Sequence, residues 1–248
     1  MKKLLILPVL LSLFAEAGTL RVALAANVSY AMPELIKAFR VHHTDTQVQT
    51  TVSGSGKLAT QIRSGAPYDL FLSANMAYPQ TLFKAGATTA APVVYAQGAL
   101  AYLSEKPRDF TQGITLLSDP AIHRIAVANP RTAPYGKAAF EALTSAKLLA
   151  SLRPKFIYGE SIAQTVTYTT HGADIGLIAK SALYAPQMRH YKAGVNWADV
   201  DASLYRPIDQ GMVVLKASKN MAEAKVLYDF LLSSEARAIF TRYGYRLP

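Results

Sequence analysis

Apolar and polar residues alternate along the chain with two periods, one typical of strands and one typical of helices. Short apolar or alternating runs predict strands, and apolar residues at helical spacing predict helices between them. The predicted strands are 19–25, 47–52, 69–73, 99–103, 125–128, 155–158, 174–178 and 212–215. The predicted helices are 32–42, 57–64, 76–85, 137–150 and 162–170, with one or two more over 221–243. This order favours an α/β fold of parallel sheets with helices on both faces.

The order of elements also indicates two lobes. Residues 96–98 and 210–211 are interpreted as the places where the chain crosses from one lobe to the other. The first lobe would then comprise 18–97 plus 212–248, and the second lobe 98–211. Two hinged α/β lobes place a ligand in the cleft between them.

The N-terminus has the layout of a secretory signal peptide. Lys2 and Lys3 precede the uncharged apolar run 4–14, and 15–17 read as an A-x-A cleavage site. We therefore expect residues 1–17 to be removed and the protein to be periplasmic. The chain has no cysteine, which excludes disulfides, thiolate metal sites and a lipid anchor on a cysteine after the cleavage site.

The net charge of +10 is compatible with an anionic partner. The basic residues are scattered, and no run of five occurs. Export also argues against nucleic acid as the partner. The five histidines show no metal-ligand spacing, so a zinc or copper site is not expected.

Four predicted strand-to-helix junctions are rich in small, polar or glycine residues. They are 25–29, 52–56, 133–136 and 159–162. A helix start offers unpaired N–H groups and the positive end of a dipole, and ligands of α/β sheets bind at such junctions. One junction alone reads as ordinary helix capping, but four together predict an anion site made of uncharged donors.

The sequence resembles the periplasmic molybdate-binding proteins of ABC importers. The strongest block is 52–74 (VSGSGKLATQIRSGAPYDLFLSA), which matches a Ser/Gly-rich turn followed by L-x-x-Q-I-x-x-G-A-P-x-D-L-F-x-S-A. Further matches are 25–27 at the first ligand turn, 129–136 at the third, and the closing helix motif 238–245. The resemblance implies a two-lobed, type II periplasmic-binding-protein-like α/β fold with the ligand cleft between the lobes.

The resemblance also implies the ligand contacts. Asn27 and Ser55 would supply side-chain and backbone donors from the first lobe, and Tyr135 and Ile162 backbone N–H groups from the second. These residues would hold the metal only as molybdate or tungstate oxyanion, not as a bare cation. Some family members place a tyrosine where this chain has Ala179, which leaves the fifth contact and the role of the Tyr135 hydroxyl open.

The expected protein is a monomeric, non-enzymatic binding protein without a cofactor. Its partners would be the small oxyanion and an inner-membrane ABC permease. Two alternatives stay open. One is a binding protein for another small anion such as sulfate, and the other is an exported hydrolase. A hydrolase would need a base near Ser55, and the sequence places no histidine near any of the four junctions.

Overall fold

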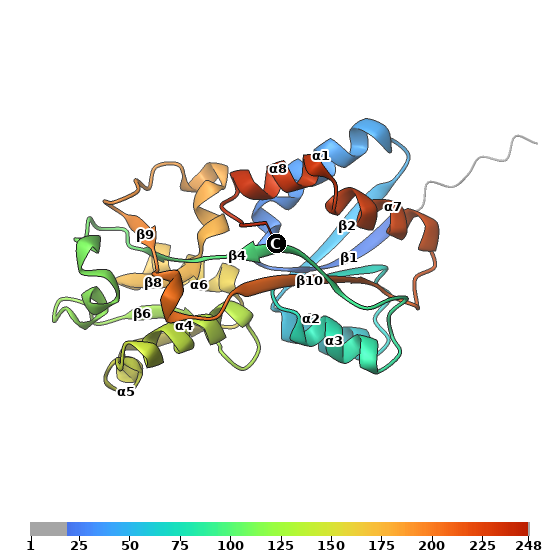
Figure 1. Ribbon diagram of the computed structural model, residues 1–248. Helices are drawn as coiled ribbons and strands as arrows, with labels where there is room; N and C mark the ends of the chain where they lie inside the picture. The colour runs from blue at the N-terminus through green and yellow to red at the C-terminus, as the bar shows by residue number, and fades with distance from the viewer. Residues whose placement is uncertain (1–18, 248) are drawn as a thin grey trace, which may run out of the picture.

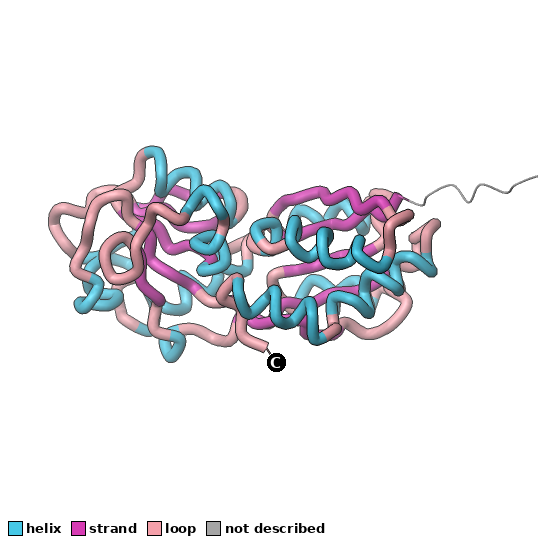
Figure 2. Tube along the Cα trace, turned by 90° about the horizontal axis from the view of Figure 1, so that it is seen from above, coloured by secondary structure: helices cyan, strands magenta, loops and turns pink. Residues whose placement is uncertain are grey.

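The computed structural model of the protein describes residues 19–247, so the predicted signal peptide lies outside the described residues. Two lobes lie side by side, and each is built on its own five-stranded sheet (Figures 1 and 2). Within residues 19–247, no helix combines the length and the apolar character that a membrane crossing requires.

The first lobe contains strands from both ends of the chain, in the order β2-β1-β3-β10-β4. These strands are β1 (Thr19–Ala25), β2 (Gln47–Ser53), β3 (Leu70–Ser73), β4 (Val93–Gly98) and β10 (Ile208–Val214). Its helices are α1 (Met32–His42), α2 (Ser55–Arg63), α3 (Ala77–Lys84), α7 (Met221–Leu231) and α8 (Ser234–Arg242). A short 3₁₀ turn, η1 (Val28–Tyr30), follows β1.

Helices cover both faces of this sheet because side chains of successive strand residues point to opposite faces. On β1, Leu20 and Val22 pack with residues of α1, α7 and α8 such as Phe240. Ala23 faces the other way and packs with residues of α2 and α3, among them Leu58. Two separate apolar cores thus fix the position of β1, whose end carries the first predicted ligand turn.

The second lobe comes from the middle of the chain, in the order β7-β6-β8-β5-β9. Its strands are β5 (Leu100–Leu103), β6 (Ile125–Ala128), β7 (Phe156–Gly159), β8 (Ile175–Ala179) and β9 (Trp197–Asp199). Its helices are α4 (Pro134–Ser145), α5 (Leu149–Leu152) and α6 (Ile162–His171). Shorter 3₁₀ segments include η4 (Lys180–Tyr184) and η6 (Ala202–Leu204).

The prediction of wholly parallel sheets is wrong, because each sheet contains antiparallel pairs where the chain changes lobes. β10 runs antiparallel to β3 and β4, and β5 runs antiparallel to β8 and β9. The proposed crossing stretches 96–98 and 210–211 pair within the first sheet, with Gln210 opposite Ala96. Residues 208–211, which the sequence-based division placed in the second lobe, are therefore part of β10. The sequence prediction missed β4 and β9.

Two helices begin earlier than predicted. The α2 helix begins at Ser55 rather than residue 57, and α4 begins at Pro134 rather than residue 137. Proline suits the first helical turn because its fixed φ is helical and that turn needs no N–H bond. α4 also ends at Ser145, short of the predicted residue 150, since Lys147 adopts a left-handed φ of 59°. The residues read as turns are therefore first turns of helices, with N–H groups available for a ligand.

Candidate functional site

The four predicted ligand residues line one small cavity between the lobes. Asn27 follows β1, Ser55 begins α2, Tyr135 is the second residue of α4, and Ile162 begins α6. The cavity is lined by Ala25, Ala26, Asn27, Gly54, Ser55, Ala74, Ala133, Pro134, Tyr135 and Ile162. Its volume of about 10 Å³ lies far below the roughly 300–1,000 Å³ of sites for drug-sized molecules. The cavity therefore suits a ligand of few atoms.

Three α-helices present their starts to this cavity. Neither Gly54 before α2 nor Ala133 before α4 caps its helix with a side-chain hydrogen bond. Before α6, Ser161 does cap the helix, but it accepts from the Gln164 N–H and so leaves that of Ile162 uncapped. The first N–H groups of a helix have no acceptor within it. The three helix starts together give the cavity a positive potential without a charged side chain.

Ser55 is buried and its hydroxyl is oriented by the backbone of the neighbouring strand end. The Ala74 N–H donates to Ser55 Oγ over 2.9 Å. This bond occupies an acceptor position on the oxygen, and the hydroxyl hydrogen stays available to donate. Ser55 can therefore offer the cavity a backbone N–H and a hydroxyl donor from one residue.

The side-chain amide of Asn27 donates to other protein groups, which differs from its predicted use as a ligand donor. Its Nδ2 donates to Gln210 Oε1 at 2.7 Å and to the Tyr245 hydroxyl at 2.9 Å. The Asn27 carbonyl accepts from the Tyr245 hydroxyl at 2.8 Å and from Ser181 Oγ at 2.9 Å. Both amide hydrogens are thus used, and the donor left for the cavity is the backbone N–H. Asn27 Oδ1 is buried and has no hydrogen-bond partner among the described residues.

Tyr135 contributes its backbone to the cavity while its ring points toward the strands that join the lobes. A Cβ on Gly98 would lie 2.0 Å from the Tyr135 hydroxyl oxygen, so only glycine fits at the end of β4. Burial raises the pKa of Tyr135 well above its ordinary value, so the hydroxyl stays neutral. Among the described residues, this hydroxyl has no hydrogen-bond partner. The ring closes the back of the site.

The two lobes touch across the mouth of the cavity. The Gly56 N–H donates to the Thr132 carbonyl at 3.1 Å, and the Tyr78 hydroxyl donates to that of Arg131 at 3.4 Å. A Cβ on Gly54 would lie 3.0 Å from the Glu160 carbonyl oxygen. The glycines of the Ser/Gly-rich turn thus allow backbone from both lobes to meet. The protein is in a closed arrangement.

Among the residues that the structure describes, no charged side chain and no histidine lines the cavity. Within residues 19–247, no three His, Cys, Asp or Glu side chains cluster as a cation site would require. Among the described residues that line the cavity, no base lies beside Ser55. Uncharged donors at converging helix starts are the chemistry of an anion site.

Three residues that support the site were not predicted. Ser181, Gln210 and Tyr245 are buried polar residues that contact Asn27 from separate parts of the chain. The sequence offered one indication of their role, a polar residue within a mostly apolar run, because Gln210 lies in the buried strand β10. Ala179, where some family members have a tyrosine, is buried at the end of β8 and does not line the cavity.

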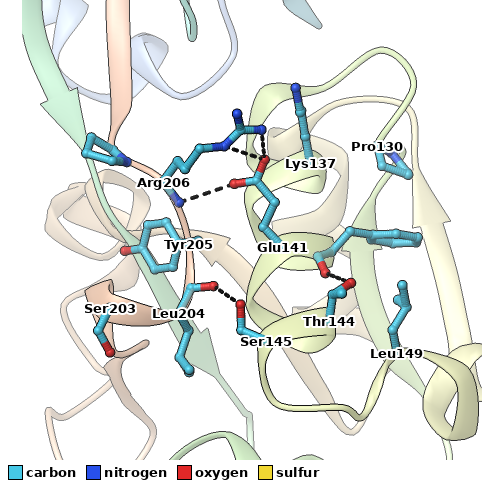
Figure 3. A pocket seen from close by; sticks show the side chains of 12 residues that line it. Pro130, Lys137, Glu141, Thr144, Ser145, Leu149, Ser203, Leu204, Tyr205 and Arg206 are labelled. Atoms are coloured by element: carbon cyan, nitrogen blue, oxygen red, sulfur yellow. Dashed lines mark hydrogen bonds and ion pairs between the residues drawn. The ribbon is translucent and has the colours of Figure 1, made fainter.

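A second, wider hollow lies on the second lobe between α4 and residues 203–207. Figure 3 shows Arg206 and Glu141 facing each other there, joined by an ion pair and by a backbone hydrogen bond. It is open to solvent and largely apolar, with Leu204 and Leu149 in its lining. Glu141 and Arg206 neutralise each other, and the charged side chain of Lys137 also lines this hollow, which distinguishes it from the uncharged lining of the interlobe cavity.

Comparisons with known proteins agree with this geometry. The family described as bacterial extracellular solute-binding protein matches residues 20–246. Molybdate-binding protein ModA of Azotobacter vinelandii is 34% identical over 240 residues, covering 96% of this chain and 94% of that protein. Its counterpart in Rhodobacter capsulatus is 35% identical over 238 residues, with coverages of 95% and 91%.

Solved structures give the same result. The Azotobacter vinelandii periplasmic molybdate-binding protein matches with a TM-score of 0.85 at 30% identity, covering 92% of this chain and 99% of that one. The sulfate-binding protein SubI of Mycobacterium tuberculosis matches with a TM-score of 0.74 at 14% identity, covering 92% and 86%, a likeness of fold alone. The chain therefore belongs to the family of bacterial extracellular solute-binding proteins, which are transport components rather than enzymes.

Proposed function

We propose that this protein captures molybdate, and tungstate by the same chemistry, for import by an ABC transporter. The observation that carries the proposal is the interlobe cavity, in which three helix starts and Ser55 converge while no charged side chain lines the wall. The proposed contacts are the backbone N–H groups of Asn27, Ser55, Tyr135 and Ile162, together with the Ser55 hydroxyl. The Asn27 side chain has no contact in this scheme.

A lining made of donors selects for a fully deprotonated anion. Each oxygen of molybdate or tungstate accepts hydrogen bonds and brings no proton of its own. Hydrogen phosphate brings an O–H group, which would face donors and stay unpaired. An unpaired buried polar group costs about 1–3 kcal/mol, which corresponds to roughly tenfold to a hundredfold in affinity.

Sulfate has the same charge and the same acceptors as molybdate, so cavity size has to separate the two. The relatives at 34% and 35% identity bear the name molybdate-binding protein, and this favours the larger anion. The expected compartment is the periplasm, because the similar Azotobacter vinelandii protein is named a periplasmic molybdate-binding protein. There the protein would act as a monomer, without a lipid anchor, and deliver the anion to an inner-membrane ABC permease.

Isothermal titration calorimetry with molybdate, tungstate, sulfate and phosphate tests the proposal. The mature chain from residue 18 is the appropriate sample. We expect molybdate and tungstate to bind at least a hundredfold more tightly than sulfate, and phosphate to bind more weakly still. Preferential binding of sulfate would assign the protein to sulfate import. Binding of none of the four anions would overturn the proposed function.

A further inference from the structure

The turn that carries Asn27 is held by the C-terminal segment of the chain. The Tyr245 hydroxyl donates to the Asn27 carbonyl at 2.8 Å and accepts from Asn27 Nδ2 at 2.9 Å. The same carbonyl also accepts from Ser181 Oγ of the second lobe at 2.9 Å. Tyr245 is buried, and its ring packs edge-on against Phe240 with 5.5 Å between centroids. One residue from each lobe therefore fixes a single peptide group.

A hydrogen bond that fixes a backbone carbonyl also fixes the N–H of the same peptide, because the C=O and N–H of a planar trans peptide point in opposite directions. Ser29 Oγ donates to the Ala26 carbonyl at 2.7 Å, and the Asn27 N–H belongs to that same peptide. This N–H therefore points away from Ser29. The hydrogen bonds from Tyr245 and Ser181 to the Asn27 carbonyl fix the next peptide, Asn27–Val28, in the same manner. Asn27 thus keeps one orientation at the cavity wall, with its carbonyl directed away.

The segment with Tyr245 lies where the lobes join. Arg246 and Gln97 exchange two backbone hydrogen bonds, of 2.7 and 2.8 Å, which tie the segment to β4 just before the chain enters the second lobe. A Cβ on Gly244 would lie 2.6 Å from the Tyr184 ring, which belongs to η4 of the second lobe. The C-terminal segment therefore contacts both lobes. Its place in Figure 1, beside β4 at the centre of the molecule, agrees with these contacts.

We propose that Tyr245, together with Ser181, is a positioning residue of the oxyanion site. By holding the Asn27–Val28 peptide, the two residues fix the turn that presents the Asn27 N–H to the ligand when the lobes are closed. The proposal rests on the function proposed above and adds a residue that does not line the cavity. A hydroxyl suits this role because it donates and accepts at once. Because burial raises the pKa of Tyr245, the hydroxyl remains neutral and keeps both bonds across the physiological range.

The test is Tyr245→Phe, which removes the hydroxyl and keeps the ring. Molybdate affinity is measured by calorimetry, and the melting temperature of the ligand-free protein is measured in parallel. The matched control is Tyr95→Phe. Tyr95 is also buried and also packs on Phe240, with 5.3 Å between centroids, but its hydroxyl has no partner among the described residues. Ser181→Ala is a second variant, acting on the same carbonyl from the other lobe.

We expect Tyr245→Phe to weaken molybdate binding at least tenfold, Ser181→Ala to weaken it several-fold, and Tyr95→Phe to leave it unchanged. The amide resonance of Asn27 in a nitrogen-15 spectrum should shift on molybdate addition in the wild type and shift less in Tyr245→Phe. A merely structural role would lower the melting temperature without changing this resonance.

Affinity of Tyr245→Phe within twofold of the wild type would overturn the proposal. An equal loss in Tyr95→Phe would also overturn it. If Tyr245→Phe does not fold, Ser181→Ala decides alone, and unchanged binding in that variant refutes the positioning role. A wild-type protein that binds none of the four anions would show instead that the proposed function is wrong.

Discussion

Ser55→Ala is the most informative single change in the proposed site. Ser55 is buried at the first position of α2, and its oxygen already accepts from the Ala74 N–H at 2.9 Å. Its hydroxyl hydrogen is therefore directed by a fixed acceptor geometry, and the anion is the proposed recipient. Alanine keeps the helix start and its N–H groups, so the change removes one donor without removing the dipole.

Ser55→Ala removes two hydrogen bonds, one to the anion and one from the Ala74 N–H, and the two losses have different effects. A hydrogen bond to a charged group contributes about 1.5–3 kcal/mol, and tenfold in affinity corresponds to about 1.4 kcal/mol. Molybdate should therefore bind roughly 10 to 150 times more weakly. The Ala74 N–H also loses its acceptor, but both residues lie in the first lobe. That cost burdens the free and the bound protein alike and appears as a lower melting temperature rather than as lost affinity.

Calorimetry and thermal unfolding separate these two effects. The matched control is Ser64→Ala, at the exposed C-terminal end of the same helix, which should change neither quantity. Molybdate affinity within twofold of the wild type in Ser55→Ala would refute the argument that this hydroxyl faces the ligand. An affinity loss with tungstate but not with molybdate would refute the shared contact set.

The remaining predictions concern closure, local strain and pH. Gly56→Ala should weaken binding at least tenfold, because its Cβ would lie 3.0 Å from the Thr132 backbone carbonyl of the other lobe and 2.7 Å from the Tyr78 hydroxyl of its own lobe. Tight binding by this variant would contradict the closed arrangement. Lys147→Gly should raise the free energy of unfolding by up to about 1 kcal/mol, since the left-handed φ costs a side-chain-bearing residue energy that glycine avoids, and a lower melting temperature would count against this. Molybdate affinity should be constant from pH 6 to pH 9, because no His, Asp, Glu, Lys or Arg lines the cavity and burial raises the pKa of Tyr135, which keeps its neutral form throughout that range; a titration within that window would require an ionisable group at the ligand.

The family and the central part of the site could be predicted from the sequence. In the block 52–74, a turn, a helix, a helix stop and a buried strand follow one another directly. Such elements depend on the preferences of neighbouring residues, which can be recognised in the sequence. Four junctions of small and polar residues likewise indicated Asn27, Ser55, Tyr135 and Ile162, and the structure brings all four to one cavity. Each junction was recognisable because helix starts have their own residue preferences.

Contacts between distant segments needed the tertiary structure. The side-chain amide of Asn27 donates to Gln210 and Tyr245, which lie some two hundred residues later in the chain. The antiparallel strands β5 and β10 follow from how the chain passes between lobes, which no local pattern encodes.

The physical reason for this division is the range of the interactions. Helix starts, turns and apolar periodicity arise from neighbours along the chain, so the sequence by itself determined where the four junctions lie and indicated the class of ligand. The direction of each donor depends on which buried groups satisfy the adjacent carbonyls and side chains. In this protein those groups come from β10, η4 and the C-terminal segment, and only folding brings them beside Asn27.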